Sequence, residues 1–333
     1  MWKRLKNGFR IPIDGPKRLC YGWLVIVSIL LTTLGFGLLF WGAEWLVKGG
    51  AGLALRLGLT TLVVGLTVVA YGTSSPELLV SLKAAWSGQP GIAVGNVVGS
   101  NIFNIAVILG LAAVIRPVKV ESEAIRRDGP VMVGVSLAAL AVLWDGNVSR
   151  LEGALLVVAS IFYTVWIVRQ ARLERRESGA GKSPIPVGRA VLYLVIGLGL
   201  LAAGSKLLVD HSIVIARALG VSEAVIGLTI IAAGTSMPEL ATSVIGALRG
   251  QSDIALGNVI GSNIFNVLFV LGLASVIHPI VGAGVRPVDQ AFLLGTAVLL
   301  WPMMRSGRVV GRREGWILLA AYAAYLAVMW PRG

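Results

Sequence analysis

Cysteine, histidine and charged residues are scarce in this sequence of 333 residues. The single cysteine, Cys20, cannot form a disulfide within the chain, and two histidines, His211 and His278, are too few for a histidine-built metal site. Charged residues make up 14% of the chain, whereas about 25% is usual in a soluble domain. A water-soluble globular protein is therefore excluded. The sequence also has no GxSxG, HExxH or nucleotide-binding motif, so we expect no enzyme activity.

Hydrophobic residues are abundant, at 56% of the chain, and they occur in long runs. A helix needs about 20 apolar residues to cross a bilayer. Ten runs are bounded by charges or by glycine and proline clusters, at 22–47, 59–83, 92–114, 130–145, 151–168, 190–215, 224–248, 254–276, 288–304 and 314–330. No small-residue cleavage motif follows the basic segment 1–18, so the first run is predicted to be an uncleaved helix. The pattern predicts an all-α integral membrane protein with ten transmembrane helices.

An internal repeat divides the chain. Residues 70–111 align without a gap to residues 232–273 at an offset of 162, with 25 identities in 42 positions. The same offset pairs the preceding segments, so that 42–111 corresponds to 204–273. A gene for one half has therefore been duplicated.

The repeat and the runs define two halves of five spans each. We expect a first half at 1–168, a polar linker at 169–189 and a second half at 190–333. An odd number of spans makes the second half enter the membrane from the opposite side, as in many secondary transporters. The two halves are thus predicted to be inverted repeats, with the functional site where they meet and with helices broken at that site.

The net charge of +13 comes from basic residues between the apolar runs, so these residues are topology signals and not a nucleic-acid surface. With alternating sides, seventeen Lys and Arg lie on the side of the linker and twelve on the side of the termini. This excess places the linker in the cytoplasm and both termini outside a prokaryotic cell membrane, although the basic segment 1–18 opposes that orientation.

Each repeat core contains a helix breaker. In GTSSPE, Pro76 has no N–H to donate to the carbonyl of Gly72, and its ring crowds that carbonyl. Gly234 and Pro238 repeat the arrangement. Backbone carbonyls freed in the middle of a membrane need a partner, and a cation supplies one.

A carboxylate follows each break, Glu77 in the first half and Glu239 in the second. Acids inside a membrane span are costly and mark functional sites. Thr73 and Ser74 share a helix face with Glu77, so hydroxyl, carbonyl and carboxylate oxygens converge. Such hard ligands suit calcium or sodium. The alternative, a structural pair with a lysine, is disfavoured because Lys83 has no counterpart in the second half.

The next helix of each half carries GNVVGSNIFN or GNVIGSNIFN. Ser100 and Asn104 share a helix face, as do Ser262 and Asn266, and these four side chains are candidates to complete the coordination. Close helix packing is the competing explanation for the Gly, Ser and Asn residues here, including Asn96.

These paired motifs resemble the two alpha-repeats of the sodium/calcium exchanger family, within the cation/calcium antiporter superfamily. The resemblance implies ten helices in two inverted halves and four cation positions between the second, third, seventh and eighth helices. For calcium it implies Glu77, Glu239 and the backbone carbonyls of Thr73 and Thr235. For sodium it implies Glu77, Glu239, the carbonyls of Ala70 and Ala232, and Ser74, Ser100, Ser236 and Ser262. It places Asn104 and Asn266 at the central position.

The sequence departs from some members of that family at Asn266, where they have an aspartate. The site is thus expected to hold two carboxylates and no third, which argues against potassium coupling. We expect an antiporter that exports calcium in exchange for sodium by alternating access, with no resident cofactor and no nucleic-acid or protein partner. Two alternatives stay open at this point. The first is calcium/proton antiport, because two protons neutralise two buried acids as well as two sodium ions do. The second is a cation channel lined by the same oxygens.

Overall fold

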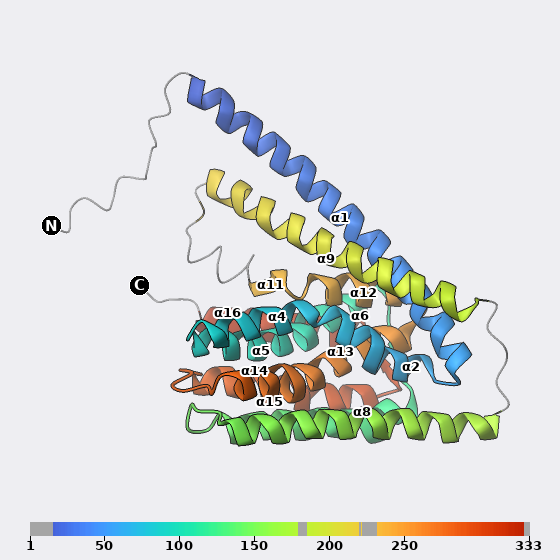
Figure 1. Ribbon diagram of the computed structural model, residues 1–333. Helices are drawn as coiled ribbons and strands as arrows, with labels where there is room; N and C mark the ends of the chain where they lie inside the picture. Colours follow the sequence, from blue (N-terminus) through green and yellow to red (C-terminus); the bar gives the residue numbers. More distant parts are fainter. Residues whose placement is uncertain (1–15, 179–184, 220, 222–231, 330–333) are drawn as a thin grey trace.

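The computed structural model describes residues 16–178, 185–219, 221 and 232–329, and these are almost entirely helical (Figure 1). Part of the predicted span 224–248 and the basic residues before Pro16 lie outside the described residues. Six described helices are long and apolar enough to cross a membrane, and a seventh span results if two helices joined at a 46° bend count as one. The protein is therefore a multi-pass membrane protein.

The helices of the first half follow the predicted apolar runs. They are α1 (Pro16–Leu57), α2 (Thr61–Val64), the π-helical η1 (Gly65–Val69), α3 (Ala70–Thr73), α4 (Ser75–Trp86), α5 (Pro90–Phe103), the π-helical η2 (Asn104–Leu109), α6 (Gly110–Ile115), the π-helical η3 (Ala124–Asp128), α7 (Gly129–Val142) and α8 (Arg150–Ser178).

The second half repeats this order where it is described. Its helices are α9 (Val187–Ala218), α11 (Ala232–Gly234), α12 (Met237–Leu248), α13 (Ser252–Phe265), the π-helical η5 (Asn266–Leu271), α14 (Gly272–Ile277), α15 (Pro287–Arg305) and α16 (Arg312–Met329). The short π-helical segments η2 and η5 begin at the equivalent residues Asn104 and Asn266. Such segments inside α-helices often occur at functional sites.

The stretch 169–189 is only partly a linker. Helix α8 continues to Ser178, so the first ten residues of the predicted linker are helical. Gln, Ala, Arg, Leu and Glu, which make up most of this stretch, are good helix formers, and its first glycine comes only at position 179. The drop in hydropathy therefore marks the end of the apolar run at residue 168, whereas the helix itself continues to Ser178.

Two long helices, α1 and α9, lie side by side and run obliquely across the other helices (Figure 1). Glycines at seven-residue intervals allow their backbones to touch. A Cβ atom on Gly35 would lie 2.9 Å from the carbonyl oxygen of Gly204, and one on Gly42 would lie 2.9 Å from that of Gly197. The offset of 162 turns the first pair into the second, so each half contributes the same surface to this contact. Small residues at such contacts are typical of packed membrane helices.

Helix α13 lies at the centre of the remaining helices, and every residue from Ile254 to Phe265 is buried. Its glycines bring it against the first half: a Cβ atom on Gly257 would lie 2.7 Å from the carbonyl oxygen of Leu62, and one on Gly261 would lie 2.5 Å from that of Leu66. The two halves are thus interleaved and do not form separate domains.

The halves also pair at their loops. Strand β1 (Val118–Lys119) is antiparallel to β2 (Val309–Val310), with Val118 opposite Val310. Val148 and Ile280, which are equivalent to Val310 and Val118, form a second bridge. The first pairing precedes α16 and the second precedes α8, and these helices begin at opposite ends of the bundle (Figure 1). Equivalent loops therefore lie at opposite ends.

The glycine contact between α1 and α9 predicts a difference between two substitutions on one helix. A Cβ atom on Gly42 would also lie 2.8 Å from the backbone nitrogen of Leu201, whereas one on Gly37 meets no atom of the described residues within 4 Å. Gly42→Ala is expected to lower the free energy of unfolding by about 1–3 kcal/mol through overpacking. Gly37→Ala is the control and is expected not to lower it. Thermal unfolding in detergent measures both, and equal melting temperatures would contradict the contact.

Candidate functional site

The predicted helix break is present in both halves. Ser74 separates α3 from α4, and the two helices meet at the 46° bend. Serine hydroxyls, which the sequence did not indicate, donate to the two glycine carbonyls at the breaks. Ser75 Oγ donates to the Gly72 carbonyl at 2.6 Å, and Ser205 Oγ donates to the Gly234 carbonyl at 2.7 Å. Hydroxyl groups are available here because one serine follows its glycine by three residues and the other lies on the neighbouring helix α9. These two carbonyls are thus already hydrogen-bonded.

The carboxylates of Glu77 and Glu239 are fully buried in the first turns of α4 and α12. Each accepts a hydrogen bond from the serine at the break of the other half: Ser236 Oγ donates to Glu77 Oε1 at 2.8 Å, and Ser74 Oγ donates to Glu239 Oε1 at 2.7 Å. Ser100 Oγ also lies 3.4 Å from Glu77 Oε1. The two breaks therefore interlock, and their positive helix N-termini favour the negative charges.

The second oxygen of each carboxylate has no such partner. Eight buried side-chain atoms of the described residues lack a hydrogen-bond partner, and six of them belong to predicted ligands: Glu77 Oε2, Glu239 Oε2, Ser262 Oγ, Asn266 Oδ1, and Oδ1 and Nδ2 of Asn104. Buried polar atoms without partners are rare and need an explanation. Carboxylate, hydroxyl and amide oxygens are ligands of hard cations, so this set fits calcium or sodium.

The two glutamates have no charged partner among the described residues. Within the described ranges, neither carboxylate forms an ion pair, and no third Asp, Glu, His or Cys joins them. A structural lysine pair is therefore absent from this part of the chain.

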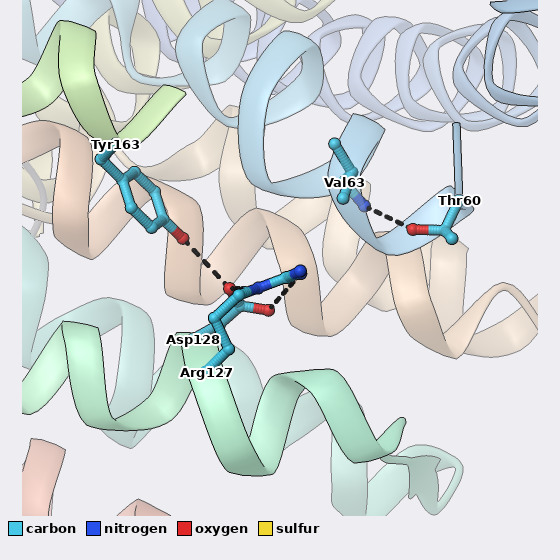
Figure 2. Close-up of polar contacts among 5 residues, drawn as sticks. All are labelled: Thr60, Val63, Arg127, Asp128 and Tyr163. Atoms are coloured by element: carbon cyan, nitrogen blue, oxygen red, sulfur yellow. Dashed lines mark hydrogen bonds and ion pairs between the residues drawn. The ribbon is translucent and has the colours of Figure 1, made fainter. Parts of the chain in front are cut away.

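Asp128 shows the opposite case (Figure 2). It is also buried, but Arg127 Nε donates to its Oδ1 at 2.8 Å, Arg127 Nη2 donates to its Oδ2 at 3.2 Å, and the Tyr163 hydroxyl lies 3.4 Å from Oδ1. Both oxygens and the charge of Asp128 are thus satisfied within the protein. The contrast sets Glu77 and Glu239 apart as the buried acids with capacity for a cation.

Two asparagines hold the helices that carry the glutamates. Asn96 Nδ2 donates to the backbone carbonyl of Glu77 at 3.0 Å and to Ser81 Oγ at 2.9 Å. In the second half, Asn258 Nδ2 makes the equivalent bonds to the Glu239 carbonyl and to Ser243 Oγ, at 3.3 and 3.0 Å. Asn96 therefore has a positioning contact that packing alone does not explain. The signal was in the repeat, where both asparagines and both serines recur at the offset of 162.

The threonines predicted to bind calcium face these amides across the two halves. Thr73 Oγ1 donates to Asn258 Oδ1 at 3.0 Å, and Thr235 Oγ1 lies 3.5 Å from Asn96 Oδ1. The Ala70 carbonyl accepts from Ser74 N at 2.9 Å and lies 3.3 Å from Thr73 Oγ1. Ala232 begins α11. The roles of these carbonyls as ion ligands stay predictions.

The orientation of Asn266 is fixed by a further amide. Its Nδ2 donates to Asn101 Oδ1 at 3.0 Å, and Asn101 Nδ2 donates to the Asn263 carbonyl at 3.0 Å. The sequence left open whether Asn266 presents an oxygen or an N–H to an ion. One of the two N–H groups of its amide is engaged by Asn101, and its Oδ1 has no partner in the described structure, so the oxygen is the atom available to a cation.

One further buried hydroxyl, one helical turn from Glu239, was not among the predicted ligands. Thr242 Oγ1 has no hydrogen-bond partner in the described structure, and it lies one helical turn after Glu239. The repeat does not indicate this hydroxyl, because the equivalent residue in the first half is Val80, which has none. The spacing of three residues from an intramembrane acid was the available signal.

The charges outside this cluster form separate contacts. Glu44 accepts from Arg249 at 2.8 Å, and Lys206 pairs with Asp210 at 2.8 Å. Lys48 lies over the ring of Tyr193, 5.2 Å from its centroid. Glu44 and Arg249 thus join α1 to the end of α12, Lys206 and Asp210 pair within α9, and Lys48 of α1 contacts Tyr193 of α9.

Comparison with known proteins gives matches over nearly the whole chain. Residues 27–169 and 189–330 match the family described as sodium/calcium exchanger protein. The chain is 40% identical to a putative antiporter CaxA of Alkalimonas amylolytica, over 90% of this chain and 98% of that protein. It is 37% identical to the inner membrane protein YrbG of Escherichia coli (strain K12), over 92% and 98%. It is 33% identical to the sodium/calcium exchanger MaX1 of Methanosarcina acetivorans, over 92% and 99%.

Solved structures match as well. The sodium-calcium exchanger NCX_Mj, soaked with zero Na⁺ and Ca²⁺, superposes with a TM-score of 0.80 at 34% identity. The match covers 92% of this chain and 99% of that chain.

The asparagine contacts predict unequal effects in the two halves. Asn258→Ala removes three hydrogen bonds from a fully buried site, and orphaned buried groups cost about 1–3 kcal/mol each. Asn96 is only partly buried and its bond to Thr235 is longer, so Asn96→Ala is expected to cost less. Thermal unfolding in calcium-free detergent ranks the two variants. A larger loss in Asn96→Ala would contradict the assigned network.

Proposed function

Because this chain belongs to the sodium/calcium exchanger family, we propose that it is an antiporter that exports calcium in exchange for sodium by alternating access. The observation that carries the proposal is the pair of buried carboxylates, Glu77 and Glu239. Each comes from a different half, each is held through one oxygen by a serine of the other half, and each leaves its second oxygen without a partner in the described structure.

The charge of the site accounts for coupling between the two ions. Two carboxylates supply two negative charges, which one calcium ion or two sodium ions neutralise equally. Both ions compete for the same oxygens, so binding of one displaces the other. The calcium ligands in this proposal are Glu77, Glu239, Thr73 and Thr235. The sodium ligands are Glu77, Glu239, Ala70, Ala232, Ser74, Ser100, Ser236 and Ser262, and Asn104 and Asn266 occupy the central position.

The architecture that fits this function is ten transmembrane helices in two inverted halves, 1–168 and 190–333. Crosswise hydrogen bonds between equivalent serines and glutamates support it, as do the equivalent loop pairings before α8 and α16. An inverted pair of halves presents the same site to either side of the membrane, which alternating access requires. In this proposal the linker side faces the cytoplasm, and the protein lies in a prokaryotic cell membrane.

A flux experiment tests the coupling directly. Purified protein in proteoliposomes is loaded with calcium, and sodium and proton gradients are imposed separately. Calcium movement driven by the sodium gradient alone supports the proposal. Movement driven only by the proton gradient would make the protein a calcium/proton antiporter, and an ohmic current without a counter-ion would make it a channel.

Removal of one carboxylate charge is expected to abolish calcium transport. Glu77→Gln and Glu239→Gln keep the size of the side chain but remove one of the two negative charges. Hydrogen bonds to charged groups are worth about 1.5–3 kcal/mol, and loss of a full ligand charge is expected to cost at least that much. Calcium affinity therefore falls by about 10- to 100-fold or more, and transport is lost at calcium concentrations that support the wild type. Glu44→Gln is the control, because Glu44 pairs with Arg249 away from this cluster. Size-exclusion chromatography checks folding, and normal calcium uptake by either variant would refute the site.

Substitution of Asn266 is expected to change the dependence on pH or potassium. In Asn266→Asp, the donor to Asn101 Oδ1 is replaced by a carboxylate oxygen, so two acceptors face each other beside two other acids. A proton or a potassium ion is then needed to offset the third charge, and transport becomes sensitive to one of them. Asn266→Ala removes the amide without adding charge and is the control. Wild-type transport that requires potassium, or unchanged profiles in Asn266→Asp, would show that this residue does not face the ions.

A further inference from the structure

A basic cavity lies at the linker-side end of the bundle, away from the two glutamates. Its volume is about 380 Å³, and three arginines line it together with a serine, an isoleucine and a tryptophan: Arg126, Arg305, Arg308, Ser122, Ile125 and Trp301. Arg126 comes from η3, Arg305 ends α15, and Arg308 lies in the turn before β2. Residues from two halves of the sequence thus surround one space. A volume of this size falls within the range of about 300–1,000 Å³ that is usual for small-ligand sites.

The three arginines have no ion-pair partner among the described residues. Over the ranges that the structure describes, none of them forms an ion pair, although Arg127, the neighbour of Arg126, is paired with Asp128 (Figure 2). The acids of the same segment, Glu121 and Glu123, do not line the cavity. Arg305 stacks over the ring of Trp301, at 5.9 Å from its centroid, which leaves the edge of its guanidinium for an anion.

The backbone at Arg308 is held in an unfavourable conformation. Its φ is +54°, and among the described residues it is the one non-glycine residue with a positive φ. A side chain disfavours this left-handed region, and such strain persists mainly at functional sites. The carbonyl of Arg308 accepts a bond from Val120 N at 2.9 Å, which ties the turn to the paired strands.

The internal repeat provides the comparison. The residue equivalent to Arg308 is Gly146, whose φ is +75°, so the same left-handed turn has the expected glycine at the other end of the bundle. The equivalents of Arg126 and Arg305 are Val288 and Leu143, which carry no charge. The preference for basic residues on one side of a membrane explains arginines in a loop. It does not explain an arginine in place of glycine at a left-handed position, nor three arginines around one cavity.

We propose that this cavity binds an anionic phosphate group, either the headgroup of an acidic phospholipid or a free phosphate. Guanidinium groups match phosphate oxygens with paired N–H donors, and the Ser122 hydroxyl supplies another donor. Trp301 and the end of α15 place the cavity at the height where headgroups lie, and basic pockets between membrane helices bind such headgroups. The site is separate from the ion-binding cluster and does not depend on the proposed transport.

The test compares the thermal stability of pocket variants in lipids of different charge. The protein is placed in nanodiscs of phosphatidylcholine alone or with phosphatidylglycerol, and its melting temperature is measured by intrinsic fluorescence. Phosphatidylglycerol is expected to raise the melting temperature of the wild type by several degrees. Arg305→Gln and Arg308→Gly are expected to lose at least half of that shift. Arg313→Gln removes the same charge on the same side outside the cavity, and it is expected to keep the shift.

Arg308→Gly separates binding from folding. Glycine relieves the positive φ, so this variant is expected to melt no lower than the wild type in phosphatidylcholine while it loses the response to phosphatidylglycerol. A second arm titrates inorganic phosphate into detergent-solubilised protein. A shift there that depends on Arg305 and Arg308 identifies free phosphate as the ligand, and a shift with phosphatidylglycerol alone identifies the lipid. Equal responses of the pocket variants and Arg313→Gln, or no response of the wild type to either probe, would overturn the proposal.

Discussion

Two carboxyl groups buried in the centre of an apolar bundle are the constraint on which the rest of this structure depends. Glu77 and Glu239 are buried without an ion pair in the described chain, and each is held by a serine from the opposite helix break. A buried acid without a charged partner destabilises a fold unless a proton or a cation neutralises it, which is why the proposed function gives these two carboxylates to a cation. Interleaving of the two halves follows from the same need, because neither half alone provides both acids and both serines.

The two halves perform equivalent tasks with different residues. The Gly72 carbonyl at the first break accepts from Ser75, the first residue of α4, whereas the Gly234 carbonyl at the second break accepts from Ser205 of α9. The equivalents of these serines are Met237 and Ala43, which cannot donate a hydrogen bond. In both halves the buried carbonyl accepts a hydrogen bond, but the donor comes from α4 in the first half and from α9 in the second.

The charged side chains do not follow the symmetry of the internal repeat. Asp128 forms an ion pair with Arg127 and a hydrogen bond with Tyr163 (Figure 2). In the described ranges, the central glutamates have serine partners but no ion pair. At the linker-side end, Arg308 occupies a turn that the repeat builds with glycine at the opposite end. The repeated backbone is thus shared by both halves, and its charged side chains give the two ends different surfaces.

The sequence by itself determined the membrane class, the duplicated halves, the helix breaks and the residues at the break, because these follow from hydropathy, internal identity and the chemistry of proline. It identified Glu77, Glu239, Ser262, Asn104 and Asn266, whose buried atoms lack partners in the described structure. It did not indicate the serine donors to the Gly72 and Gly234 carbonyls or the continuation of α8 to Ser178, and it left open whether Asn96 has a role beyond packing. The tertiary structure decided these points, because a drop in hydropathy does not mark the end of a helix, and because Ser205 and Asn96 contact atoms of other helices that the sequence does not place beside them. Thr242 was missed for the same reason: its burial beside Glu239 is set by packing across helices, and periodicity along one chain does not record it.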